Sequence, residues 1–237
     1  MTSFWAIADT HLSFGKPKDV SRFGDLWIDH AERIRASWLA QVAPDDVVII
    51  GGDISWADKP SKVLADLAWI GALPGRKILL RGNHDHWWRT INDVRTLLAT
   101  YGLEAIEADA IQIDGVILCG TMGYLAPNDP YYHADQTKDR ERYERELGRL
   151  ESALIAGTAI RNHDQPLIVL LHYPPFTSDA QPTAFSAAIS RAHPTMCLYG
   201  HLHRPPEWAV AVNEVRDGIL YRLIASDFVN MTLQKIW

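Results

Sequence analysis

The stretch Asp46-Val47-Val48-Ile49-Ile50-Gly51-Gly52-Asp53 joins a short apolar run to two glycines and a carboxylate. A short apolar run rich in β-branched residues is typical of a strand that is buried on both faces of a parallel sheet. The glycines let the backbone turn tightly where the strand ends. We therefore expect Asp53 to project from the carboxyl end of a central strand.

Similar apolar runs recur along the chain and alternate with segments of helical periodicity. This alternation predicts a parallel sheet built by right-handed crossovers. The expected strands are 4–8, 46–50, 77–80, 166–171 and 195–199, and the expected helices are 25–42, 62–70, 88–101, 138–156 and 184–192.

The second half of the chain also contains short strands that follow one another directly. Residues 103–106, 110–113 and 116–119 are such strands, and Asp114-Gly115 predicts a hairpin between the last two. The tail from Trp208 to Trp237 predicts three antiparallel strands. The expected fold class is α/β, with two mixed β-sheets, each begun by one half of the chain and covered outside by helices.

The composition excludes several classes of protein. A net charge of -6 and a pI near 5.9 argue against a protein that coats nucleic acid, since backbone binding needs a basic face. No run reaches the ~18 apolar residues of a membrane span, so we expect a cytoplasmic protein with no membrane partner. Cys119 and Cys197 lie in apolar runs and are expected to be buried, reduced thiols. The sequence gives no indication of the oligomeric state.

Polar residues follow the strands in a fixed series. They are Asp9 and His11, Asp53, Asn83 with His84 and Asp85, His172, and His201 with His203. Carboxyl ends of parallel strands meet at one edge of a sheet, so these side chains are expected to converge. Oxygen donors mixed with imidazoles suit divalent Mn, Fe or Zn better than Mg or Ca.

The spacing within the series also favours metal binding. Asp9 and His11 are two residues apart, so on an extended segment both side chains fall on one side, and the same holds for His201 and His203. Taken alone, His172 is more typical of a structural residue at a strand end, and residues 82–85 fit a polar turn as well as a metal site. The whole series instead favours two divalent ions, whose natural chemistry is hydrolysis of a phosphoester.

This series resembles the pattern of the calcineurin-like metallophosphoesterase superfamily: Asp-x-His, Gly-Asp, Gly-Asn-His-Asp/Glu, His and Gly-His-x-His, here over residues 9–203. The chain looks most like the small bacterial phosphohydrolases. The resemblance implies a four-layer α/β/β/α sandwich in which the two mixed sheets pack face to face, within one domain over residues 1–237.

The resemblance also implies roles for individual residues. Asp9, His11 and His203 would bind one metal ion, Asn83, His172 and His201 would bind the other, and Asp53 would bridge both. His84 would contact the phosphate and protonate the leaving group, and Asp85 would orient His84. The acidic residue and arginine that protein Ser/Thr phosphatases carry after Gly-Asp are missing from Gly52-Asp53-Ile54-Ser55-Trp56, which argues against protein phosphatase activity.

The expected substrate is a small phosphoester, with a phosphodiester slightly favoured over a monoester. A nucleotide-like substrate suits the aromatic residues expected near the opening, although core packing explains tryptophans equally well. These residues are Trp56, Trp87, Trp88, Tyr124, Tyr131 and Tyr132. The alternative function is a non-catalytic binding module with the same fold, but such a module would be expected to have lost ligands or the proton donor.

Overall fold

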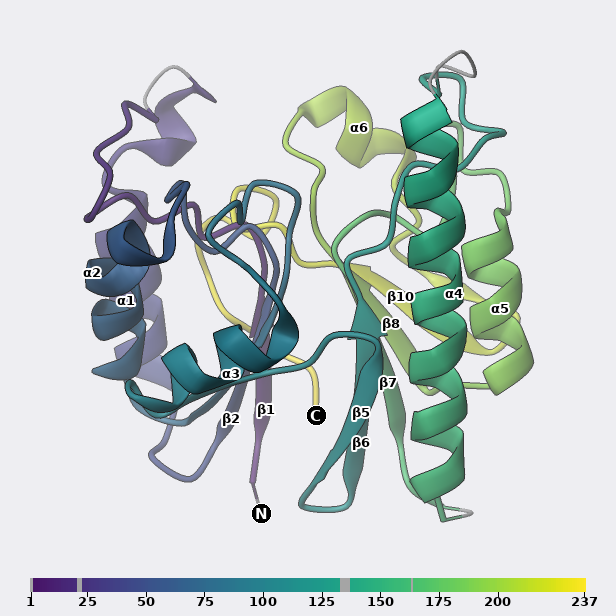
Figure 1. Ribbon diagram of the computed structural model, residues 1–237, viewed down its shortest axis with the longest axis horizontal. Coiled ribbons are helices and arrows are strands. Elements are labelled where there is room, and N and C mark those ends of the chain that lie inside the picture. Colours follow the sequence, from purple (N-terminus) through teal and green to yellow (C-terminus); the bar gives the residue numbers. More distant parts are fainter. Residues whose placement is uncertain (1, 21–22, 133–136, 163) are drawn as a thin grey trace. The chain divides into compact units, whose positions relative to one another are not determined.

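The computed structural model describes residues 2–20, 23–132, 137–162 and 164–237. Within these ranges the chain forms two compact units, which Figure 1 shows as ribbons. Unit 1 comprises residues 1–105 and 224–237, and unit 2 comprises residues 106–223. The chain thus leaves unit 1 after its first half and returns to it at the end. The prediction of a single domain over residues 1–237 stays a prediction.

Unit 1 contains a five-stranded sheet in the order β11-β1-β2-β3-β4. The four strands from β1 to β4 run parallel, and β11 pairs with β1 in the antiparallel direction. The strands are β1 (Phe4–Ile7), β2 (Val47–Gly51), β3 (Arg76–Leu80), β4 (Leu103–Ala105) and β11 (Gln234–Lys235). The predicted parallel pairing of the first three strands is confirmed.

The helices of unit 1 pack on one face of this sheet. They are η2, a short 3-10 helix (Asp25–Trp27), α1 (His30–Gln41), α2 (Pro60–Gly71) and α3 (Ile91–Ala99). Trp38 of α1, Leu67 of α2 and Leu98 of α3 share one buried core with Val48 and Leu79 of the sheet. The apolar positions that recur at helical spacing in these segments therefore form the helix faces that the structure buries.

Unit 2 contains a six-stranded sheet in the order β5-β6-β7-β8-β10-β9. Its strands are β5 (Asp109–Ile113), β6 (Val116–Thr121), β7 (Leu167–Leu171), β8 (Met196–Tyr199), β9 (Val215–Arg216) and β10 (Ile219–Leu223). The pairs β6-β7, β7-β8 and β8-β10 are parallel, while the two edge pairs are antiparallel. The predicted hairpin is confirmed, and both its turn residues, Asp114 and Gly115, have positive φ, as a type I′ turn requires.

Helices α4 (Thr137–Ile160) and α5 (Ala184–Ala192) cover one face of the unit 2 sheet, and α6 (Pro205–Val210) follows β8 (Figure 1). Both sheets are mixed and flanked by helices, so the predicted α/β fold class is confirmed. In the described parts of the chain, no helix is long and apolar enough to cross a membrane.

Two predicted elements differ from the structure. The helix expected over 25–42 is interrupted, because Asp29 has a φ of 51° and α1 begins only after it. The tail does not begin with an antiparallel strand, since Trp208 lies in α6, and β10 pairs in parallel with β8. Two prolines begin α6, where a missing N–H costs nothing, and the side chain of Glu207 accepts from the N–H groups of His203 and Arg204.

Candidate metal centre

Two segments of unit 1 run side by side just beyond the strand ends. Asp9 N donates to Gly52 O, His11 N donates to Asp53 O, and Leu12 N donates to Ile54 O, each at 2.9 Å. The segment that follows β1 therefore extends alongside the segment that follows β2. This pairing brings Asp9, His11 and Asp53 together.

The predicted ligands on these segments have an unusual backbone. The φ angles of Asp9, His11 and Asp53 are 59°, 43° and 50°, in the left-handed region that L-residues seldom adopt. The two side chains do converge, as expected. However, the segment that carries Asp9 and His11 is not extended, so the reason given for the expectation was wrong. Such strain persists only where surrounding contacts fix it, and it concentrates at functional sites.

The side chains of Asp9, His11 and Asp53 form a compact buried cluster. One ligand-capable atom from each lies within 4.8 Å of the others, and His11 Nε2 is 3.6 Å from Asp53 Oδ2. Asp9 is 0% exposed and Asp53 is 1% exposed. Two buried carboxylates are costly unless positive charge compensates them, so this donor set fits a divalent cation.

A second loop, which follows β3, is hydrogen-bonded to Asp53. The backbone N–H of His84 donates to Asp53 Oδ1 at 2.7 Å. A Cβ atom on Gly82 would overlap the backbone N and Cα of Asp53 as well as its carboxylate. Only glycine at position 82 therefore lets the two loops approach this closely. Asn83, which lies between these residues, is half-buried.

Asp85 holds the same two loops together from inside. Its buried carboxylate accepts from the backbone N–H groups of Gly82, Ile54 and Ser55 and from the indole Nε1 of Trp87, at 2.8 to 3.1 Å. Burial and the negative charge of Asp53 raise the pKa of Asp85. Among the described residues, none of these hydrogen bonds reaches the His84 imidazole, so Asp85 positions the backbone that carries His84.

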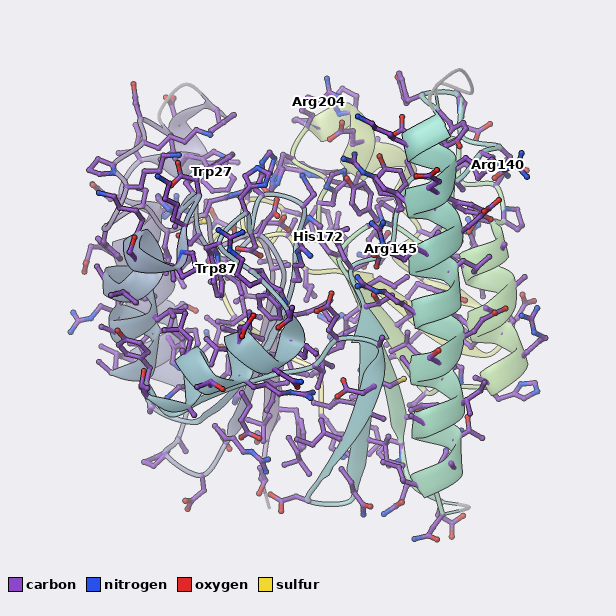
Figure 2. The ribbon with its side chains drawn as sticks, in the orientation of Figure 1. Trp27, Trp87, Arg140, Arg145, His172 and Arg204 are labelled. Atoms are coloured by element: carbon purple, nitrogen blue, oxygen red, sulfur yellow. The ribbon has the colours of Figure 1, made fainter. Side chains whose placement is uncertain are left out.

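An aromatic side chain packs on this cluster. The indole of Trp56 stacks on His11 with ring centroids 4.4 Å apart, and it lies 4.6 Å from the ring of His84. The ammonium of Lys18 lies 2.8 Å from the centre of the Trp56 ring, a cation–π contact that the sequence pattern did not indicate. Trp87, which Figure 2 labels, is fully buried in the core of unit 1 instead, and Trp88 is largely buried in the same core.

Unit 2 carries the remaining histidines beyond its strand ends. Figure 2 shows His172 beyond the end of β7, where its N–H donates to Met122 O and its carbonyl accepts from Gly200 N. The rings of His172 and His201 are nearly perpendicular, with centroids 5.2 Å apart, and His201 has a φ of 73°. The backbone N–H of His203 donates to Glu207 at 3.0 Å.

Parallel strands that deliver carboxylates and imidazoles at their carboxyl ends are typical of metal-dependent hydrolases. The pattern of the calcineurin-like phosphoesterases matches residues 2–205 of this chain, which therefore belongs to that family.

Relatives of known name support the same assignment. The chain is 32% identical to the Gene 66 protein of Mycobacterium phage L5, over 59% of this chain and 69% of the phage protein. It is 29% identical to a probable cyclic nucleotide phosphodiesterase of Rhodopseudomonas palustris, over 95% of this chain and 81% of that protein. The family and this relative support a hydrolase that cleaves phosphoesters.

Solved structures share the fold. The phosphopantetheinyl hydrolase of Mycobacterium tuberculosis superposes with a TM-score of 0.59 and 15% sequence identity, covering 99% of this chain and 95% of that one. A protein of unknown function from Aquifex aeolicus superposes with a TM-score of 0.52 and 15% identity, covering 99% and 96%. At this level of identity the likeness concerns the fold alone.

Proposed function

We propose that the protein is a metal-dependent phosphodiesterase that hydrolyses a small phosphoester and prefers a diester to a monoester. The observation that carries the proposal is the buried convergence of Asp9, His11 and Asp53, whose ligand-capable atoms lie within 4.8 Å of one another. The preference for a diester is supported by the Rhodopseudomonas relative, which is a probable cyclic nucleotide phosphodiesterase.

The proposed ligands form two sets joined by one carboxylate. Asp9, His11 and His203 would hold one divalent ion, Asn83, His172 and His201 would hold a second, and Asp53 would contact both. We favour manganese, with iron or zinc as alternatives, because the donors mix oxygen with imidazole. When bound, such ions stabilise negative charge on the reacting phosphoryl oxygens and lower the pKa of water toward neutrality.

His84 is the proposed proton donor to the departing alkoxide. Its backbone is fixed by the hydrogen bond to Asp53, and its ring packs against Trp56. Asp85 would act as a positioning residue, because its four hydrogen bonds hold the loop that carries His84. A cytoplasmic location stays a prediction.

Metal content and turnover test the proposal together. Metal-stripped protein reloaded with Mn²⁺ should bind two ions per chain and should hydrolyse bis(p-nitrophenyl) phosphate faster than p-nitrophenyl phosphate. Asp53→Asn should lose both metal binding and activity. A protein that holds its metal but turns over no phosphoester would instead support the alternative function, a non-catalytic binding module.

The role of His84 has a separate test. His84→Ala should keep its metal and should lose much more activity on an alkyl ester than on a nitrophenyl ester, because only the poor leaving group needs a proton. His86→Ala is the matched control, since His86 is a nearby exposed histidine. Equal loss on both esters would argue against proton donation, and equal loss in the His86 variant would remove the special role of His84.

A further inference from the structure

Unit 2 contains an open cavity of about 500 Å³ beside one of the proposed metal ligands. Its walls come from the loop after β6, the loop after β7, and the segment that includes α6. Figure 2 labels Arg204, which lines the cavity at the start of α6. A volume in this range is typical of a pocket for a small organic molecule.

One of the proposed metal ligands of unit 2 lines the cavity. His201 forms part of its wall, and the ring of His201 packs on that of Tyr173 with centroids only 4.0 Å apart. Tyr173 lines the same cavity. A group bound there would therefore lie beside His201, which is one of the proposed metal ligands.

The walls of the cavity are mainly aromatic and aliphatic. The aromatic residues are Tyr124, Tyr131, Tyr173, Phe176 and Tyr199. The Phe176 ring is held rigidly, because it packs edge to face on Tyr221 at 4.8 Å and the Arg216 guanidinium lies 5.0 Å from its centre. Rigid rings offer flat faces on which another ring can stack at little entropic cost.

Several polar groups around the cavity already have hydrogen-bond partners in the protein. Asp129 accepts from the N–H groups of Tyr131 and Ser178, and Arg204 Nε donates to Glu207 at 2.8 Å. The hydroxyl of Tyr199 donates to Val212 O at 2.8 Å. An uncharged flat ring can contact the apolar walls without breaking these contacts.

We propose that this cavity binds the organic part of the substrate and that this part contains an uncharged, planar aromatic ring system, as a nucleoside does. The inference rests on the proposed function, from which it takes the reaction, and it adds the class of substrate. It excludes sugar phosphates and glycerol-type phosphodiesters as the preferred substrates. Tyr131, which is 69% exposed, then serves as a stacking surface at the rim of the cavity.

Ligand binding to metal-free protein tests the proposal without any need for turnover. Saturation-transfer NMR with thymidine and with methyl β-riboside compares two ligands that both carry a pentose and differ mainly in the aromatic ring. We expect thymidine to bind and the riboside not to bind. Equal binding of both, no binding of thymidine, or equally tight binding of an n-alkyl alcohol such as hexanol would overturn the proposal.

Two neighbouring tyrosines provide the matched variants. Tyr131→Ala should weaken thymidine binding by about fivefold or more, since stacking on one ring contributes at least that much. Tyr132→Ala should leave binding unchanged, because Tyr132 does not line the cavity. An unchanged affinity in the Tyr131 variant, or an equal loss in both, would contradict the assignment.

The outcomes separate this inference from the proposed function. Thymidine binding by a protein that hydrolyses no phosphoester would leave the cavity assignment intact and refute the proposed reaction. Turnover of phosphodiesters without thymidine binding would refute only the cavity assignment.

Discussion

Replacing Gly82 by alanine should distort the candidate metal centre, because there is no room for the added methyl group. The added Cβ would overlap the backbone of Asp53, whereas ordinary contact begins at 3.4 Å. The two loops must therefore separate by roughly 1 Å, because packed interiors leave no room for the methyl group. That movement displaces both Asp53 and the His84 N–H that binds it.

The expected effect is larger on activity than on stability. A displacement of this size costs about 100-fold in turnover when it moves catalytic groups. Overpacking costs about 1–3 kcal/mol in the free energy of unfolding, which for a chain of this length lowers the Tm by roughly 2–4 °C per kcal/mol. Phosphodiester hydrolysis measures activity, calorimetric titration with Mn²⁺ measures metal affinity, and thermal unfolding followed by circular dichroism measures stability.

Gly148→Ala is the matched control for this substitution. Gly148 lies in α4, and a Cβ there would meet nothing within 4 Å. We expect this variant to keep full activity and to gain up to about 1 kcal/mol in stability, since alanine favours the helix. If Gly82→Ala matched the Gly148 variant in metal affinity, activity and Tm, the close approach of the two loops would not matter for the site.

Three further substitutions or treatments test other parts of the structure. Thr183→Ala should lower the free energy of unfolding by about 1 kcal/mol, because Thr183 caps α5 through Ser186, and an unchanged denaturation midpoint would contradict this. Burial raises the pKa of Asp66, so the folded state binds its proton more tightly than the unfolded state, and its contribution to stability falls as pH rises from 3.8 through the folded-state pKa. The Tm of Asp66→Asn should therefore rise relative to wild type between pH 3 and pH 7, and a constant difference would argue against the shift. Burial raises the pKa of Cys119 to about 12, so a thiol reagent should label it only after unfolding, and rapid labelling of native protein would be inconsistent with its position.

The sequence predicted the parallel strands because their signal is local. Val47 to Ile50 are apolar without interruption, and the structure buries all of them between neighbouring strands. The approximate positions of the polar residues follow from the same reasoning, since a residue that comes directly after a parallel strand lies at its carboxyl edge. Asp9, His11 and Asp53 converge for this reason.

The features that the sequence did not predict depend on distant contacts. The left-handed backbone of Asp9 and His11 is held by hydrogen bonds to residues 52–54. Asp and His adopt this conformation more often than other non-glycine residues, but most of them do not, so the residue type alone does not identify such a position. The contact between Lys18 and Trp56 likewise joins two loops far apart in sequence. Trp56 and Trp87 are both tryptophans, and the sequence alone did not distinguish their roles. Trp56 packs on the His11 ring, whereas Trp87 is fully buried in the core.

Asp85 shows how one residue of a motif can act through the backbone. Its place after His84 favoured a direct contact between the two side chains, but its carboxylate accepts N–H groups from two different loops. An acidic residue suits this position because a carboxylate only accepts hydrogen bonds, and all four neighbours donate. Asparagine would turn an NH₂ group toward at least one of these donors. The motif therefore fixes the loop geometry, since Gly82 allows the close approach to Asp53 and Asp85 holds the loop whose His84 N–H donates to Asp53.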